Sequence, residues 1–278
     1  KNPRILGDYT WTGWDYIGEA GIGVVKYNDK KGFNAPWPCF LAYCGDINII
    51  GDRRPMSYYR EIVFGLRKEP YIAVQLPEHY ADKKNMTPWA AQECVGSWTW
   101  PGFEEKPCIV EVYSDAAEVE LFLNGRSLGR KTTERFKACY DISYVPGELR
   151  AVCYRDGAAA QEYRLKSAGS GLCLRAETDR ETLGPDGQDL AFVTISVEDG
   201  RGVLNTSGAH RVDVSVEGPA VLQGLGSGAP YSTENFTAWS HLTFEGRLLA
   251  VVRATGKGEI VVRLQMEEQE VLVSMRAE

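Results

Sequence analysis

The residues best suited to chemistry lie near the start of the chain, between Gly7 and Glu19, where aromatic and acidic side chains alternate with glycine. Trp11 and Trp14 could stack on the apolar face of a sugar ring, and Asp15 and Glu19 could accept hydrogen bonds from its hydroxyl groups. In a β/α barrel, residues of these types belong at the carboxyl end of a strand. Composition alone still favours the plainer interpretation that these aromatic residues are core residues.

The segment that carries these side chains, residues 1–66, is rich in aromatic residues and glycine and differs from the rest of the chain. The pattern predicts one helix over 57–66, capped by Ser57, with Tyr58 and Ile62 on its apolar face. One or two strands and a helix cannot bury their own aromatic residues. We therefore expect this segment either to dock on the first β-sandwich that follows it or to be poorly ordered.

From about residue 67 the pattern changes to short alternating runs separated by turns, which is typical of a β-sandwich. The sequence Asn124-Gly125 lies between two such runs and is a strong signal for a tight hairpin. The strands expected in this part are 71–76, 108–113, 119–123, 139–144 and 148–154.

A glycine- and serine-rich linker is expected at 166–171, after which the strand pattern starts again. This second part predicts another sandwich that is not a close repeat of the first. Its expected strands are 173–177, 190–198, 212–217, 247–254 and 259–265.

Four successive stretches resemble glycoside hydrolase family 2 β-galactosidases. Residues 11–19 resemble the eighth strand of the catalytic barrel, and 42–60 resemble the loop and last helix of that barrel. Residues 98–129 resemble the sandwich that follows the barrel in many gut-bacterial members. Residues 186–190, together with 224–228, resemble the terminal immunoglobulin-like domain.

The resemblance implies a mainly β chain with two immunoglobulin-like β-sandwiches, over 67–168 and 172–278, preceded by a remnant of a β/α barrel (its last strand and helix) over 1–66. It also implies that the chain is the C-terminal portion of a retaining β-glycosidase, a hydrolase of O-glycosidic bonds.

In this family two glutamates, about 5 Å apart, act as acid/base and nucleophile. The resemblance puts both on barrel strands that precede this chain. No Asn-Glu pair of the acid/base type occurs, and Glu134 and Glu234 lie in sandwich segments. We therefore expect no catalytic residue in this segment, no activity of the segment alone, and no cofactor.

Three positions match substrate-binding positions of the family. Trp11 matches the strand-end tryptophan that forms a wall of the sugar site, and Asp46 matches a polar residue near the bound sugar. Tyr43 is close to an aromatic position in the same loop. Asp15 has no proton-transfer role in the family, so we expect it to position or cap a loop.

Two further interpretations of the sandwiches stay open: they bind carbohydrate as accessory modules, or they brace the barrel or build a homo-oligomer. Tyr231, Phe236 and Trp239 are the candidate sugar-binding aromatics of the second sandwich. For Trp98 and Trp100, packing in a core or against the barrel is the favoured interpretation.

Charge and composition restrict the partners. The net charge is −7, from 31 Lys and Arg and 38 Asp and Glu, with no basic cluster, so nucleic acid is not an expected partner. The sequence contains no run of eighteen apolar residues, so we expect no membrane span. The expected partners are a β-glycoside and the rest of the barrel.

Seven cysteines occur without any Cys-x-x-Cys spacing, and the three histidines are far apart. This pattern predicts free thiols and no metal site, and it favours the reducing cytoplasm.

Overall fold

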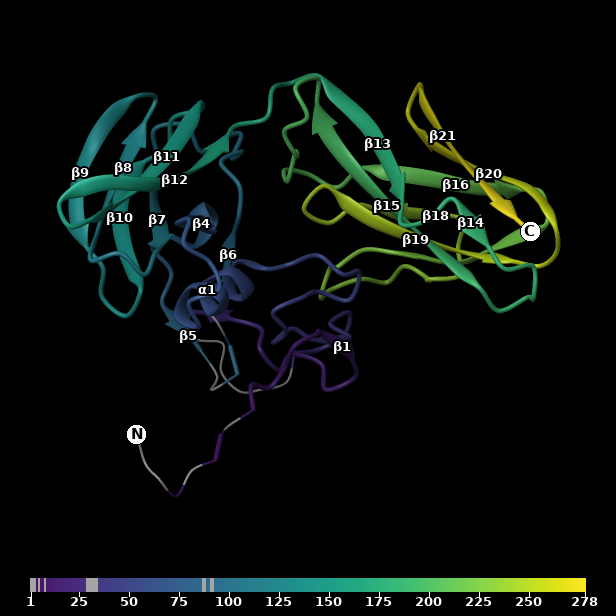
Figure 1. The fold of residues 1–278 in the computed structure, drawn as a ribbon, viewed down its shortest axis with the longest axis horizontal. Coiled ribbons are helices and arrows are strands. Elements are labelled where there is room, and N and C mark those ends of the chain that lie inside the picture. Colours follow the sequence, from purple (N-terminus) through teal and green to yellow (C-terminus); the bar gives the residue numbers. More distant parts are fainter. Residues whose placement is uncertain (1–3, 5, 8, 29–34, 87–88, 91–92) are drawn as a thin grey trace.

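The computed structural model describes residues 4, 6–7, 9–28, 35–86, 89–90 and 93–278. Two β-sandwiches lie side by side, and most of the N-terminal segment lies below and between them (Figure 1). The chain is mainly β, with one α-helix among the described residues, which confirms the predicted fold class.

The first sandwich consists of two antiparallel four-stranded sheets. One sheet has the order β10 (Lys137–Ser143), β7 (Pro107–Tyr113), β4 (Tyr71–Gln75) and β6 (Cys94–Val95). The other has the order β12 (Ala158–Lys166), β11 (Glu148–Arg155), β8 (Glu118–Leu123) and β9 (Arg126–Thr132).

Alternating apolar residues of both sheets form one core, in which Val110 and Leu121 are fully buried. Trp98 lies in the same core, and its indole Nε1 donates to the Val145 carbonyl at 3.0 Å, which confirms the packing interpretation for this residue. Asn124 and Gly125 have φ values of 51° and 81° and join β8 to β9, as the hairpin prediction requires.

The second sandwich consists of a four-stranded and a five-stranded sheet around a separate core. The first has the order β13 (Leu172–Thr178), β15 (Leu190–Asp199), β19 (Arg247–Ala254) and β17 (Ala220–Gly226). The second has the order β14 (Thr182–Leu183), β21 (Gln269–Ala277), β20 (Gly258–Met266), β16 (Arg211–Glu217) and β18 (Ser240–Leu242).

The N-terminal segment contains little regular structure. Strand β1 (Tyr16–Ile17) pairs with β3 (Leu41–Ala42), and β2 (Lys26–Tyr27) pairs with β5 (Lys84–Asn85). A single 3₁₀ turn, η1 (Pro77–His79), follows β4.

Helix α1 (Pro55–Val63) begins earlier than the sequence predicts and ends earlier as well. The prediction that Ser57 caps the helix is wrong, because Arg54 occupies the cap position and Ser57 lies buried in the first turn. Pro55 fits the first helical position, since its φ is already fixed and its missing N–H would have no partner there. Leu66 is 79% exposed, so the apolar face does not extend to it.

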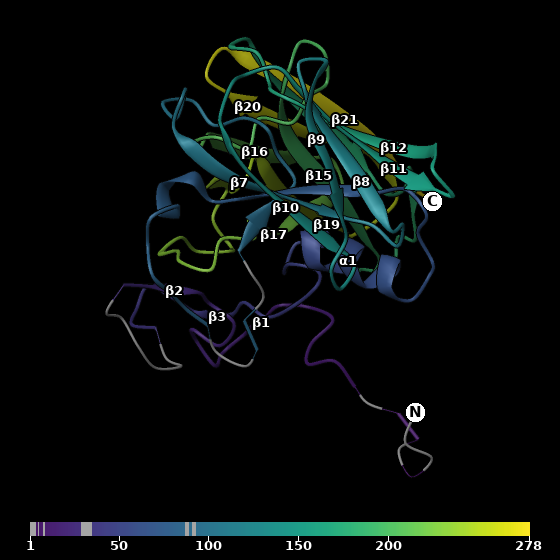
Figure 2. The same ribbon diagram turned by 90° about the vertical axis from the view of Figure 1, so that its left-hand side faces the viewer.

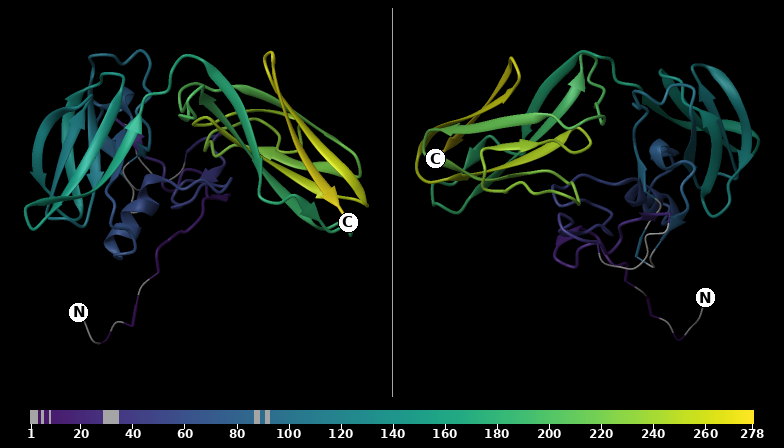
Figure 3. Two further views of the ribbon diagram at one scale, coloured as in Figure 1. Left: turned by 45° about the horizontal axis from the view of Figure 1, so that its top comes forward. Right: turned by 180° about the vertical axis from the view of Figure 1, so that it is seen from behind.

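The N-terminal segment docks on both sandwiches, as the views in Figures 2 and 3 show. Ile62 of α1 is buried against β4, and the Tyr58 ring stacks on Tyr71 at 4.1 Å between centroids. On the other side, the Phe40 amide donates to the Pro230 carbonyl at 3.2 Å. The docking expected from the sequence is confirmed, but the contact with the second sandwich was not anticipated.

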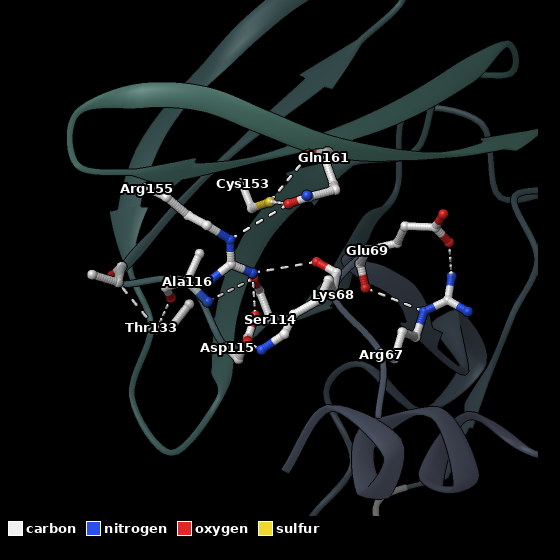
Figure 4. A network of polar contacts seen from close by, with 11 residues as sticks. Arg67, Lys68, Glu69, Ser114, Asp115, Ala116, Thr133, Cys153, Arg155 and Gln161 are labelled. Atoms are coloured by element: carbon white, nitrogen blue, oxygen red, sulfur yellow. Dashed lines mark hydrogen bonds and ion pairs between the residues drawn. The ribbon is translucent and has the colours of Figure 1, made fainter. Parts of the chain in front are cut away.

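An ionic network fixes the chain where it leaves α1 and enters the first sandwich (Figure 4). Asp115 accepts a hydrogen bond from Lys68 Nζ at 2.7 Å and forms an ion pair with Arg155. Arg67 is held by Glu69 at 3.2 Å. The network thus joins the connecting segment to the β7–β8 turn and to β11.

We predict that Ile62→Ala lowers the free energy of unfolding by about 2–4 kcal/mol, because it removes buried methyl groups from the contact between α1 and β4. Val63→Ala in the same helix is the control. Val63 is 38% exposed, and its truncation should change stability by less than about 1 kcal/mol. Denaturant titration of both variants measures the difference, and equal losses would show that the helix does not dock as described.

Candidate functional site

Two chain segments that are about thirty residues apart run side by side and form the base of the candidate site. Trp14 and Ile47 form a parallel β-bridge. The Asp15 amide donates to the Ile47 carbonyl at 2.9 Å, and the Ile47 amide donates to the Gly13 carbonyl at 3.0 Å. This pairing brings the ends of the two segments, which carry Trp11 and Asp46, next to each other.

A cavity of about 430 Å³ opens beside these segments. We call it the Trp11 cavity. Its lining includes Tyr9, Thr10, Trp11, Tyr43, Arg54 and Arg60. Of the three predicted substrate-binding residues, Trp11 and Tyr43 line the cavity directly, and Asp46 lies behind Arg60.

Trp11 is 60% exposed and is not a core residue of this chain. Its indole Nε1 donates to the Tyr16 hydroxyl at 3.2 Å, and the two rings meet edge to face with centroids 6.1 Å apart. The Tyr16 hydroxyl in turn donates to Glu19, and this hydrogen bond raises the pKa of Tyr16. The Trp11–Thr12 peptide bond is cis.

Asp46 has a mostly buried side chain, with 16% of it exposed. Its Oδ2 forms an ion pair with Arg60 Nε at 2.5 Å, and its Oδ1 has no hydrogen-bond partner among the described residues. Arg60 Nη1 also donates to Thr10 Oγ1 at 3.1 Å, beside Trp11. Arg60 therefore presents its guanidinium to one side of the site, and Asp46 holds it there from behind.

Arg54 ties the two segments together. Its Nη1 donates to the carbonyls of Tyr43 and Gly45, both at 3.1 Å, and lies 3.3 Å from Asp15 Oδ1. Its guanidinium carbon lies 3.6 Å from the centroid of the Tyr43 ring, which is a cation–π contact. Tyr43 is thus held in place by its own carbonyl and by its ring.

Asp15 positions the loop rather than facing the cavity, as the sequence predicts. Its Oδ1 accepts a hydrogen bond from the Gly45 amide at 2.7 Å. A side chain at position 45 would place its Cβ 2.3 Å from the Asp15 nitrogen, so only glycine fits there. Asp15 and Glu19 have separate partners and do not act as a carboxylate pair.

Burial is the main cause of the raised pKa values of the ionisable groups around Arg54. It raises the pKa of Asp15 to about 6, even though Arg54 and the Gly45 amide both favour the carboxylate. Burial also raises the pKa of the Tyr43 hydroxyl and of the Cys44 and Cys94 thiols, all of which line the cavity. The tyrosine and the two thiols are therefore neutral at pH 7, whereas Asp15 is mostly ionised.

Arg54 and Arg60 are the site residues that sequence reasoning missed. Both lie in the stretch 42–60 that resembles the end of the barrel, and Arg54 directly precedes the proline that starts α1. A charged residue at a helix start can be noticed in the sequence. Its partner Asp15, thirty-nine residues earlier, cannot be identified without the fold.

All seven cysteines are free thiols in the structure. Among the residues that the structure describes, no group of three or more His, Cys, Asp or Glu is arranged to hold a metal ion. Within the same residues, no helix has the length and apolar character needed to span a membrane.

Family models match both sandwiches. Residues 174–271 match the model described as glycoside hydrolase family 2 C-terminal domain 5. Residues 105–161 match a domain of unknown function (DUF4982).

A β-galactosidase of Bacteroides ovatus, BoGH2A, is 30% identical over 260 residues, which is 92% of this chain and 26% of that protein. A β-glucuronidase of Formosa agariphila is 28% identical over 171 residues, which is 59% of this chain and 17% of that protein. The chain therefore spans about a quarter or less of these relatives.

Solved structures agree in fold. A glycosyl hydrolase family 2 member from Bacteroides cellulosilyticus superposes with a TM-score of 0.88 at 33% identity, covering 99% of this chain and 36% of that one. A β-glycosidase from Bacteroides vulgatus, 19% identical with a TM-score of 0.72, supports the fold alone.

We predict that Asp15→Asn removes a pH dependence of stability. Because the folded-state pKa of about 6 lies above the reference value of 3.8, the folded protein holds this proton more tightly. Wild-type stability should therefore fall, relative to the variant, as the pH rises from 4 to 6. The expected difference over this range is roughly 2 kcal/mol.

Denaturant titrations at several pH values measure this difference. Asp156→Asn, at an exposed turn between β11 and β12, is the matched control and should leave the pH profile unchanged. Parallel pH profiles for wild type and Asp15→Asn would contradict the assignment.

Proposed function

Because this chain belongs to glycoside hydrolase family 2 and corresponds to its C-terminal part, we propose that it is the non-catalytic C-terminal portion of a retaining β-glycosidase of the β-galactosidase type. The observation that carries the proposal is Trp11. Its large aromatic side chain stays exposed at the edge of a cavity, beside an arginine–carboxylate pair, where a sugar ring could bind.

In this proposal the chain has three parts. Residues 1–66 complete a catalytic β/α barrel, and 67–168 and 172–278 are immunoglobulin-like domains that follow it. The exposed aromatic residues of the first part support this division: Trp14 and Trp37 are 53% and 71% exposed. Such residues need a further partner, and the rest of the barrel would cover them.

Trp11 would stack on the sugar at the cleavage point, with Tyr43 supporting it from below. Asp46 would act on the sugar through Arg60, which it holds at the cavity and whose guanidinium would donate to a sugar hydroxyl. An aromatic face beside the anomeric centre also favours the positive charge that develops there in the transition state. The acid/base and nucleophilic glutamates would come from preceding barrel strands.

The sandwiches would mainly brace the barrel. Their contacts with residues 38–62 support this role, since those residues carry Tyr43, Asp46 and Arg54. The free thiols favour a reducing compartment, namely the cytoplasm.

In the full-length enzyme, Trp11→Ala should lower kcat/KM for an aryl β-galactoside by about two orders of magnitude, because an aromatic contact of roughly 2–4 kcal/mol is lost. The thermal stability should change little, since the side chain is exposed. Trp14→Ala is the matched control: Trp14 is 53% exposed on the same segment but does not line the cavity. Normal kinetics with a much lower melting temperature would make Trp11 a core residue instead.

This chain alone should not hydrolyse an aryl β-galactoside or an aryl β-glucuronide. Two carboxylates that follow Trp11 in sequence already have structural partners: Asp15 binds Gly45, and Glu19 binds Tyr16. The triple variant Trp11→Ala, Asp15→Asn, Glu19→Gln provides the blank. Turnover by the purified chain well above that blank would contradict the proposal.

A further inference from the structure

A second cavity, of about 420 Å³, lies where the N-terminal segment and both sandwiches meet. We call it the junction cavity. Its lining includes Tyr43 and Arg54 from the N-terminal segment, Glu93 and Trp100 from the first sandwich, and Tyr231 and Glu245 from the second. Near it, Thr206 Oγ1 donates to Ser97 Oγ at 2.6 Å and joins the two sandwiches directly.

The junction cavity is distinct from the Trp11 cavity. Tyr43, Arg54 and Cys94 line both, so these residues form the wall between them. Trp11 lines only the Trp11 cavity, and Glu245 lines only the junction cavity. Variants of these two residues can therefore test the cavities separately.

Two polar groups of the junction cavity lack partners. The indole Nε1 of Trp100 is buried without a hydrogen-bond acceptor. The Glu245 side chain is half-buried, borders the cavity, and has no hydrogen bond or ion pair with the described residues. Burial raises the pKa of Glu245 to about 7, although Arg54 opposes the shift.

Unpaired buried groups destabilise a protein unless a ligand or water satisfies them. Trp100 can only donate a hydrogen bond, whereas a carboxylate can only accept one. A metal ion could bind the carboxylate but would leave the indole N–H without a partner. Hydroxyl groups both donate and accept, so a ligand with several hydroxyl groups satisfies both.

The rest of the lining suits a sugar ring. Aromatic side chains of Trp100, Tyr231 and Phe244 provide apolar faces, and Glu93 adds a carboxylate that already accepts a hydrogen bond from the Tyr27 hydroxyl at 2.8 Å. The volume of about 420 Å³ is within the range of small-ligand sites, and such sites are frequent between domains.

We propose that the junction cavity binds a sugar of one or two rings, between Trp100 and Glu245, as a second carbohydrate site apart from the cleavage site. Because all three parts of the chain line the cavity, a bound sugar would hold them together. It would also press on the Tyr43–Arg54 wall, which borders the Trp11 cavity. The binding itself does not depend on the proposed hydrolytic function.

The test is titration of the purified chain with galactose, lactose and cellobiose, followed by NMR chemical shifts or calorimetry. For ligands of this size we expect a Kd of roughly 1–10 mM for at least one of the three. At pH 8, above the pKa of about 7, Glu245→Gln should weaken binding about tenfold, because a charged acceptor becomes a neutral amide. The Glu245→Gln variant should stay folded, since the Glu245 carboxyl group makes no hydrogen bond or ion pair with the described residues that the amide would lose.

Three further variants, two of them controls, make the outcome decisive. Glu259→Gln, with a side chain 74% exposed on β20, should bind as wild type does. Trp11→Ala should also keep binding, whereas Trp100→Phe should lose affinity. Saturable binding that disappears in Trp11→Ala but survives in Glu245→Gln would place the sugar in the Trp11 cavity and overturn the proposal. The absence of saturable binding of all three sugars would overturn it as well.

Discussion

The guanidinium of Arg54 is the interaction on which the site depends. Arg54 occupies the N-cap position of α1. From there its guanidinium contacts two carbonyls of the loop at 43–45, the carboxylate of Asp15 and the face of the Tyr43 ring. A planar guanidinium can satisfy all these contacts at once, which the point charge of lysine cannot. Since 81% of the side chain is shielded from solvent, each contact is weakly screened. The same residue therefore connects the position of the helix to the position of the cavity wall.

The sandwiches supply the rigid frame that makes this arrangement possible. α1 packs on β4 through Ile62, and residues near Phe40 bind the loop at Pro230, so the loop at 43–45 is held from both sides. The linker between the sandwiches is fixed too: Gly169 donates to Asp199 Oδ2 at 2.8 Å, and Arg201 donates to the Ser167 carbonyl at 2.9 Å. Accessory domains of this kind act on a remote site by restricting the segments that carry its residues.

Local patterns in the sequence predict local structure well. The alternation of apolar and polar residues predicted the bounds of β7, β8, β15 and β19 within a residue or two, because one face of each strand packs in a core. It missed β12, which is mostly exposed on an edge and starts with three alanines, and also β17 and β21. The pairing of Asp15 with Arg54 and of Phe40 with Pro230 joins residues far apart in the chain, so no local pattern could reveal it. Tyr43 and Asp46 could be selected only through the resemblance to a family, which also favoured Trp11 as a site residue over a core residue.

Hydrogen exchange of the backbone amides of Asp15, Gly45 and Ile47 tests the role of Arg54 most directly. Arg54→Lys should speed their exchange by roughly tenfold or more, because the charge stays but the contacts with Tyr43, Gly45 and Asp15 are not all retained. Arg53→Lys is the matched control, since the Arg53 side chain binds Glu61 and Ser57 rather than Tyr43, Gly45 or Asp15. Fast exchange at the three amides in Arg54→Lys alone is the predicted result. Equal protection in both variants would contradict the claim that Arg54 holds the site together.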